Sequence, residues 1–460
     1  MLYDFIQLDR SREVPLWQQL YEGLRQAITS GKLSPGEKLA SIRQTCNELS
    51  ISRTTVETAY GKLCMEGFAE SQPQSGYRIR SVLPRPNIVP VQKALKPQYD
   101  FGTSSIDPQA ADLEAWRKRM RAILGDSRVL TSYGDPQGEP YLRQQLSRYA
   151  FRARGVKAGQ DCIFIGAGVG PLLQLLCPLF PEKPQVFLES PGFSQAEQIF
   201  RDYGFPIEVP ESMDRRYESP ILPDCKNGIA AELPSLRPKM ASSAAALRRT
   251  QLFSWVQAQP GRYILEDDYN GELRYKTRTL PAFQGFCPEK TIYLGSFSKL
   301  LIPSVRIAYM VLPPDLSEKA RQRVQTLNQT AGKTEQLALA EYIRLGLLEK
   351  HLRRLRRLNA RKSQVLLSAL EEVFGARADY TLYETHLAVV MTLKQPTDAA
   401  ALCRRAQAFG VRCHPSPGYF ENGSQITLGF SGIREEEILP GIHRLGDALN
   451  ATPEIEKPET

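Results

Sequence analysis

The hydrophobic pattern of the first eighty residues predicts a small helical module that ends in a hairpin. The apolar positions of its first helix, within 15–30, recur four residues apart: Leu16, Leu20, Leu24 and Ile28. Ser41 and Ser52 are typical N-cap residues, and they predict two further short helices, one through Leu49 and one over 53–67. Residues 68–80 look like two short strands around a glycine turn, which is the wing of a winged helix-turn-helix.

After a proline-rich stretch the pattern changes to short apolar runs that alternate with helix-sized intervals. The runs are Cys162–Ile165, Gln185–Leu188, Arg262–Glu266, Thr291–Leu294 and Ile307–Leu312. This order predicts an α/β domain with a mainly parallel sheet covered on both faces. Ligands of such sheets bind at the carboxyl ends of the strands.

The domain boundary is expected where this change occurs. Residues 81–99 contain four prolines and no period, which is typical of a semi-rigid, extended spacer. We therefore expect a DNA-binding module over 1–80, a linker over 81–99, a large domain over 100–450 and a disordered tail over 451–460.

Composition indicates a globular protein of the cytoplasm, with no membrane segment and no metal site. Of the 460 residues 42% are hydrophobic and 24% charged, and no apolar run approaches the roughly 20 residues of a membrane helix. The N-terminus lacks the features of a signal peptide, and the eight scattered cysteines favour reduced thiols over disulfides or metal ligands. The net charge of +9 permits a polyanionic partner, but the first eighty residues are almost balanced, with ten Lys/Arg against nine Asp/Glu.

The N-terminal module resembles the GntR-type winged helix over nearly its whole length. The resemblance is carried by P-L-W-Q-Q-L, G-K-L-S-P-G-E-K-L-A-S-I-R, S-I-S-R-T-T-V-E-T-A-Y and E-G-F. It implies double-stranded operator DNA as a partner, with the wing near the minor groove. The residues implied to contact DNA are Arg43, Ser52, Arg53, Thr54 and Thr55, with Ser75 and Gly76 in the wing. Hydroxyls and arginines at the first turn of a recognition helix reach phosphates and guanine edges, and the alternative is a helical interaction domain with a solvated face.

The segment Ile292–Val311 carries the candidate chemistry of the large domain. An apolar run ends in G-S-F-S, Lys299 follows, and Arg306 comes seven residues later. This segment resembles the lysine segment of fold-type-I pyridoxal phosphate (PLP) proteins, the aspartate aminotransferase superfamily. The resemblance implies that Lys299 forms a Schiff base with the cofactor, whose phosphate is held by Ser296, Ser298 and Arg306. A nucleophilic lysine needs apolar neighbours that keep it neutral, and the alternative is a surface lysine beside a buried strand.

Four further segments extend the resemblance through the domain: Y-G-D-P-Q-G, G-A-G-V-G-P, E-S-P-G-F and E-D-D-Y-N-G. They assign Asp267 to the ring nitrogen of PLP, Tyr269 to its ring hydroxyl and a glycine loop at the start of a helix to its phosphate. The loop residues are Gly168, Val169 and Gly170. Tyr133 is implied to reach the phosphate of the neighbouring subunit in a head-to-tail homodimer. Phe193 either stacks on the ring or is an ordinary core aromatic.

Together these segments resemble the MocR/GabR class of GntR regulators, in which a winged helix is fused to an aminotransferase-like domain. Three departures affect function: E-L-P-S-L-R-P-K-M-A (232–241) lacks the family's His-Gln pair, the phosphate loop lacks a threonine hydroxyl, and Thr427 replaces the arginine that clamps an amino-acid carboxylate. Arg237 and Arg434 are candidate substitutes for that clamp. The basic segment Arg344–Lys362 is either a solvated helix face or an additional contact to DNA.

The leading hypothesis is a transcription regulator that senses PLP, or an amine or amino-acid effector, through Lys299. An active aminotransferase with a DNA-binding appendage is the main alternative. A PLP-free scaffold that only dimerises is the third, and it requires Lys299 to be incidental.

Overall fold

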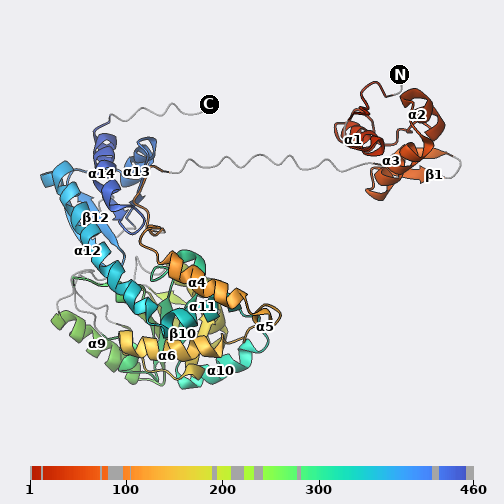
Figure 1. Cartoon of the computed structure of the whole chain (residues 1–460). Helices are drawn as coiled ribbons and strands as arrows, with labels where there is room; N and C mark the ends of the chain where they lie inside the picture. Colours follow the sequence, from red (N-terminus) through yellow and green to blue (C-terminus); the bar gives the residue numbers. More distant parts are fainter. Residues whose placement is uncertain are drawn as a thin grey trace. The chain divides into compact units, whose positions relative to one another are not determined.

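The computed structural model forms two compact units, Met1–Leu95 and Lys96–Thr460 (Figure 1). The structure describes residues 3–11, 14–72, 75–80, 97–103, 105–188, 194–208, 222–232, 242–276, 281–416 and 424–451. No helix among these residues is long and apolar enough to cross a membrane.

The N-terminal unit has the predicted winged-helix elements. They are α1 (Leu16–Thr29), α2 (Ile42–Leu49), α3 (Arg53–Met65), β1 (Ala69–Gln72) and β2 (Gly76–Ile79). The two strands pair antiparallel, from Ala69 opposite Ile79 to Gln72 opposite Gly76. The apolar faces of α1 and α3 meet in one core that includes Leu20, Leu24 and Val56, so the period-four pattern is confirmed as a core-facing stripe.

A buried hydroxyl network joins α2 and α3 in this unit. The Tyr60 hydroxyl lies 2.9 Å from the hydroxyl of Tyr3 and 2.9 Å from that of Thr45, and it donates to the Ala40 carbonyl at 3.0 Å. Thr45 and Tyr60 are fully buried. Buried hydroxyls need such partners, so the network explains why a polar residue occupies position 45 in the core-facing turn of α2.

The C-terminal unit is built on a seven-stranded sheet in the order β4-β10-β9-β8-β7-β5-β6. Its strands are β4 (Ile163–Gly166), β5 (Gln185–Phe187), β6 (Ile207–Glu208), β7 (Asn227–Glu232), β8 (Gly261–Asp267), β9 (Thr291–Ser296) and β10 (Ala308–Val311). All pairs are parallel except those of β10, which is antiparallel to β4 and β9. Only residues 297–307 separate β9 from β10, which is too short for the crossover that a parallel pair needs. The mainly parallel sheet is therefore confirmed.

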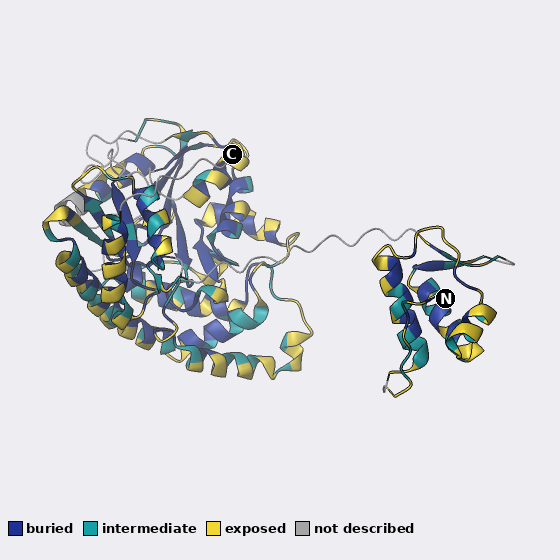
Figure 2. Cartoon of the chain, turned by 90° about the horizontal axis from the view of Figure 1, so that it is seen from above, coloured by how far each residue is buried: buried dark blue, intermediate teal, exposed yellow. Residues whose placement is uncertain are grey.

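Helices cover both faces of this sheet, as predicted. Successive residues of β4 point to opposite sides: Ile163 and Ile165 belong to one hydrophobic core and Phe164 to the other. The first face is covered by α4 (Leu113–Leu124), α6 (Pro140–Arg154) and α11 (Lys333–Arg344). The second face is covered by α7 (Val169–Leu176), α8 (Ser194–Asp202) and α10 (Pro314–Val324). Figure 2 shows buried strands between helices whose outer faces are exposed.

A long helix, α12 (Leu347–Val373), leads from these layers to a smaller subdomain (Figure 1). There, a four-stranded antiparallel sheet has the order β11-β12-β15-β14. The elements are β11 (Ala378–Tyr383), β12 (Ala388–Leu393), α13 (Ala399–Ala408), β14 (His414–Pro415), β15 (Gln425–Gly429) and α14 (Glu435–Asn450). β3 (Tyr99–Asp100) pairs parallel with β13 (Val411–Arg412), which ties the start of the unit to its end.

The described part of the chain has two further α-helices and several 3-10 helices. They are α5 (Ser127–Leu130), α9 (Ser242–Gln257), η1 (Gln160–Cys162), η2 (Cys177–Leu179), η4 (Gly271–Leu273), η5 (Phe283–Gly285), η6 (Pro303–Val305) and η7 (Gly375–Arg377).

Candidate functional site

The first turn of α3 presents the candidate DNA contacts. The Ser52 side chain caps the helix by accepting from the Thr55 amide at 3.2 Å, and its hydroxyl lies 2.9 Å from that of Thr54. The Arg53 side chain is 79% exposed and pairs with Glu57 at 2.8 Å. The cap and the α3 core thus aim one guanidinium and two hydroxyls away from the unit, in the position that a recognition helix uses to enter a groove.

The remaining candidate DNA contacts lie on nearby surfaces of the same unit. Arg43 is exposed on the first turn of α2, where Ser41 and Gln44 form a capping box. Gly76 is exposed at the start of β2 with a φ of 89°, a conformation that favours glycine. Ser75 precedes it and is half-buried.

In the C-terminal unit, the sheet register brings the candidate cofactor residues to one edge. Ala308 at the start of β10 lies opposite both Gly166 at the end of β4 and Ser296 at the end of β9. Asp267 is the last residue of β8, the next strand, opposite Leu294. Segments more than a hundred residues apart therefore meet at the carboxyl ends of the strands, where ligands of α/β sheets bind.

Lys299 lies in the turn after β9 with its amine inside the protein. The side chain is buried, and its Nζ donates to the carbonyls of Thr103 and Ser105, the latter at 3.0 Å, and to the Ser431 hydroxyl at 3.4 Å. Burial lowers the pKa of Lys299 to about 8, although the negative charge of Asp100 acts in the opposite direction. A substantial neutral fraction is therefore available near physiological pH, as a nucleophilic amine requires.

The adjacent carboxylates of Asp267 and Asp268 have different environments. Asp268 pairs with buried Arg154, whose Nη2 donates at 3.1 Å, and accepts from the Tyr293 hydroxyl at 2.9 Å. The Asp267 carboxylate, buried at the strand end, has no hydrogen-bond donor among the described residues. Burial first, and repulsion from Asp268 second, raise the pKa of Asp267 to about 7. A carboxylate in this setting fits a ligand that brings its own N–H or positive charge.

The turn after Asp268 places Tyr269 beside this carboxylate. A Cβ on Gly271 would lie 2.2 Å from an Asp268 oxygen, so the turn closes tightly only with glycine there. Tyr269 is half-buried, and its ring packs edge-on against His386 with centroids 6.4 Å apart. Burial raises the pKa of the Tyr269 phenol, which stays a hydrogen-bond donor.

On the other side of the edge, Arg306 faces the glycine loop that begins α7. Its Nη2 donates to the Ala167 carbonyl at 3.3 Å, and a Cβ on Gly168 would lie only 2.7 Å from the same nitrogen. Gly168 has a φ of 107° and is the N-cap of α7, which places Val169 and Gly170 in the first turn with amides free of helical partners. A guanidinium against helix-start amides is a cradle for a phosphate.

The structure describes some, but not all, of the other residues predicted for the cofactor site. The side chains of Ser296 and Ser298 lie close together, with their hydroxyls 3.4 Å apart. Tyr133 is fully exposed, at 101% of its reference area. Phe193 lies outside the described residues, as does most of 232–241.

Several residues at the site were not singled out from the sequence. Ser105 and Ser431 hold the Lys299 amine, and Arg154 neutralises Asp268. His386 lies against Tyr269 with its Nε2 buried and without a partner in the described part of the chain. Ser105 and Ser431 are 326 residues apart yet joined by a hydrogen bond of 2.9 Å, so no local signal could have paired them.

The fold and these sites define a class: a winged-helix DNA-binding unit joined to an aminotransferase-like unit. Residues 16–79 match the family of bacterial regulatory proteins called gntR. Residues 97–214 match the aminotransferase class I and II family, which implies binding of PLP.

Comparison with known proteins over almost the whole length identifies the family. The chain is 32% identical to the HTH-type transcriptional regulator YhdI of Bacillus subtilis, over 96% of this chain and 97% of that protein. It is 29% identical to the pyridoxine biosynthesis regulator PdxR of Corynebacterium glutamicum (94% and 95%). The structure of LysN, an α-aminoadipate aminotransferase from Thermus thermophilus, is similar with a TM-score of 0.64 and 25% identity over 76% of this chain and 92% of that chain. The chain belongs to the MocR-type HTH transcriptional regulators of the gntR family.

Proposed function

We propose that this transcription regulator binds PLP at the strand edge and controls its DNA binding by sensing PLP itself or an amine or amino-acid effector. One observation carries the proposal: a buried amine of lowered pKa, Lys299, shares that edge with a buried carboxylate, Asp267, that lacks a described donor. The two groups are complementary to an aldehyde and to a ring nitrogen, respectively.

Each residue of the edge has a distinct role in this proposal. Lys299 is the covalent anchor, and the carbonyls and the Ser431 hydroxyl around its Nζ orient the amine. Asp267 accepts a hydrogen bond from the ring nitrogen and keeps it protonated, and Tyr269 donates to the ring hydroxyl. When bound, PLP supplies an electrophilic aldehyde and a ring that withdraws electrons.

The phosphate cradle supplies the remaining affinity for the cofactor. Arg306 provides a forked donor, and the start of α7 provides amides and the positive end of a helix dipole. The other proposed ligands are Gly168, Val169, Gly170, Ser296 and Ser298, with Phe193 on the ring. Tyr133 is proposed to bind the cofactor phosphate of a second subunit in a head-to-tail homodimer. The full exposure of its side chain supports this role.

In the N-terminal unit, operator DNA is the proposed ligand of α3 and the wing. Arg53 and Arg43 are exposed and suited to guanine edges and phosphates. Ser52, Thr54 and Thr55 contribute hydroxyls at the helix start, and Ser75 and Gly76 allow the wing to approach the backbone.

The ligand pocket favours sensing over efficient transamination. Thr427 occupies the position where the family's amino-acid clamp is expected, and its hydroxyl lies 3.2 Å from that of Ser416. Arg434 is engaged at the start of α14, where it pairs with Glu437 and, at 3.4 Å, with Glu436. Arg237 lies outside the described residues. A neutral hydroxyl in place of a guanidinium costs about 1.5–3 kcal/mol of affinity for a carboxylate, so the site favours PLP itself or an effector held mainly by its amine.

A spectroscopic titration tests the proposal. Purified protein with PLP is expected to show the visible absorption band of lysine-bound cofactor, and Lys299→Ala is expected to lack it. Lys319→Ala, at an exposed position of α10, should keep the band. Amino acids added in excess are expected to shift the band without releasing stoichiometric pyridoxamine phosphate. Rapid formation of pyridoxamine phosphate would support the aminotransferase alternative, and the absence of any band in the wild type would contradict PLP binding.

A further inference from the structure

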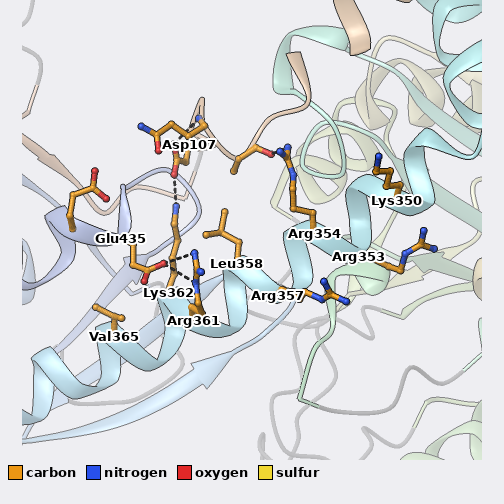
Figure 3. Close-up of a pocket in the computed structure, with 13 residues that line it drawn as sticks. Asp107, Lys350, Arg353, Arg354, Arg357, Leu358, Arg361, Lys362, Val365 and Glu435 are labelled. Atoms are coloured by element: carbon orange, nitrogen blue, oxygen red, sulfur yellow. Dashed lines mark hydrogen bonds and ion pairs between the residues drawn. The ribbon is translucent and has the colours of Figure 1, made fainter. Parts of the chain in front are cut away.

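The C-terminal unit carries a basic groove along α12. The groove has a volume of about 1010 Å³, and its lining includes six cations. They are Lys350, Arg353, Arg354, Arg357, Arg361 and Lys362 (Figure 3). Three acidic side chains also line it (Asp107, Glu435 and Glu436), which leaves an excess of three positive charges.

The acidic side chains of the groove are already paired. Asp107 accepts from buried Lys362 at 2.8 Å, and Glu435 pairs with Arg361 at 3.0 Å. Glu436 lies 3.4 Å from Arg434 at the start of α14. The wall built from these pairs is therefore close to neutral, and it fixes α12 against the segment around Asp107.

Three cations of the groove remain available. Lys350, Arg353 and Arg357 are exposed, and no described residue forms a hydrogen bond or ion pair with their charged groups. They follow each other at intervals of three and four residues, so they lie on one face of α12. In Figure 3 no dashed line reaches any of the three, whereas Arg361, Lys362 and Arg354 are engaged.

The spacing of these three cations suits a linear polyanion. At a rise of about 1.5 Å per residue, Lys350 and Arg357 are roughly 10 Å apart along the helix axis. That distance corresponds to about three nucleotide steps of one strand of duplex DNA, whose rise is about 3.4 Å per step. A row of charges on long, solvated side chains follows a backbone, whereas a compact phosphorylated molecule is bound by donors that converge on one point.

We propose that this groove binds the phosphate backbone of duplex DNA that flanks the operator, an inference that rests on the DNA-binding function of the N-terminal unit. Charge complementarity favours this occupant. The first eighty residues carry ten Lys/Arg against nine Asp/Glu, and neutralised phosphates provide most of the sequence-independent affinity of DNA-binding proteins. Lys350, Arg353 and Arg357 would add phosphate contacts to those of the N-terminal unit, whose own charges almost balance.

The test is the salt dependence of DNA binding by the full-length protein, measured on a long duplex from the promoter of its own gene. The triple variant Lys350→Gln/Arg353→Gln/Arg357→Gln is expected to lower the slope of log Kd against log salt by about 2 to 3, at about 0.9 per lost phosphate contact. The double variant Arg353→Lys/Arg357→Lys, which keeps both charges, is expected to retain the wild-type slope. A matched control, Lys319→Gln/Arg323→Gln/Arg404→Gln, removes the same charge from exposed positions of α10 and α13.

The outcomes separate this inference from the proposed function. Equal loss of slope in the triple variant and the matched control would overturn the inference, because net charge alone would then explain it. An unchanged slope in the triple variant would overturn it too, and weakened binding of tripolyphosphate by that variant would reassign the groove to a small phosphorylated ligand. Failure of the wild type to bind the duplex at all would instead contradict the DNA-binding function itself.

Discussion

The two units of the protein position their candidate functional residues in different ways. In the N-terminal unit the candidate contacts on α2 and α3 fall within Arg43–Thr55 and point outward, held by local caps at Ser41 and Ser52. In the C-terminal unit the candidate site is assembled from strand ends and turns between Thr103 and Ser431, and its key amine and carboxylate are buried. The first arrangement needs only a formed helix, whereas the second needs the whole sheet.

This difference has an energetic consequence. An exposed arginine on a helix costs little stability, because water solvates the guanidinium in the free protein and DNA replaces that water on binding. A buried carboxylate without a partner destabilises the folded protein until a ligand supplies the missing donor. Substitutions at the exposed candidate contacts of the N-terminal unit should therefore change function without changing stability. Substitutions at the strand edge should change both.

The largest expected effect is at Asp267. Asp267→Asn removes the charge that would hold the ring nitrogen, so we expect PLP affinity to fall by about 2–4 kcal/mol, or thirtyfold or more. The same substitution should stabilise the protein without cofactor. Because burial raises the pKa of Asp267 to about 7, the folded state holds a proton that the unfolded state loses above about 4. The contribution of Asp267 to the free energy of unfolding of the wild type therefore falls as the pH rises from about 4 to 7.

Thermal unfolding of cofactor-free protein at several pH values checks this expectation. The Tm of Asp267→Asn should exceed that of the wild type above pH 7 and approach it near pH 4. Asp268→Asn is the matched control, and it should lower the Tm because it leaves buried Arg154 without its ion-pair partner. The account of these two carboxylates is wrong if both variants lose stability alike.

The next effect is expected at Arg53. Arg53→Ala should weaken operator binding by about 1–3 kcal/mol, or roughly fivefold to more than a hundredfold. No change in Tm is expected, because the side chain is exposed and its pair with Glu57 is solvated. Fluorescence anisotropy with labelled duplex measures the change. Lys62→Ala, at the opposite end of α3, is the control, and equal losses in the two variants would argue against the first turn as the reading surface.

The smallest effect is expected within the core of the N-terminal unit. Thr45→Val keeps the shape but leaves the Tyr60 hydroxyl with one partner fewer, which should cost about 1–2 kcal/mol. In calorimetry of the full-length variant, only the unfolding transition of the N-terminal unit should move to a lower temperature. Thr58→Val on the exposed side of α3 removes a hydroxyl that bonds only within the helix, and a similar loss there would show that helix propensity, not the buried network, is responsible.

Sequence patterns predicted the two units unequally well. Period-four apolar residues and N-caps are local signals, and they located α1, α2 and α3 to within one or two residues. The apolar runs located five of the seven strands of the large sheet. The other two were missed, because β6 is only two residues long and Asn227–Glu232 of β7 reads as a short mixed segment. Nothing local marks β10 as antiparallel, since that follows from the length of the connection to β9.

The candidate site shows the same division. The segments around Lys299 and Asp267 were visible as motifs at strand ends. The sequence could not show that Asp268 is neutralised by Arg154, 114 positions earlier, whereas Asp267 is not. Nor could it show that Ser105 and Ser431 converge on the Lys299 amine, because such contacts exist only once the sheet and the small subdomain have formed.

The central claim, that cofactor at Lys299 controls DNA binding, is tested most directly by operator affinity measured with and without PLP in the wild type and in Lys299→Ala. The account predicts a PLP-dependent change in Kd for the wild type and none for the variant, with both proteins folded and both able to bind DNA. The claim would be contradicted if the Kd of the wild type for operator DNA were the same with and without PLP, or if Lys299→Ala showed the same PLP-dependent change.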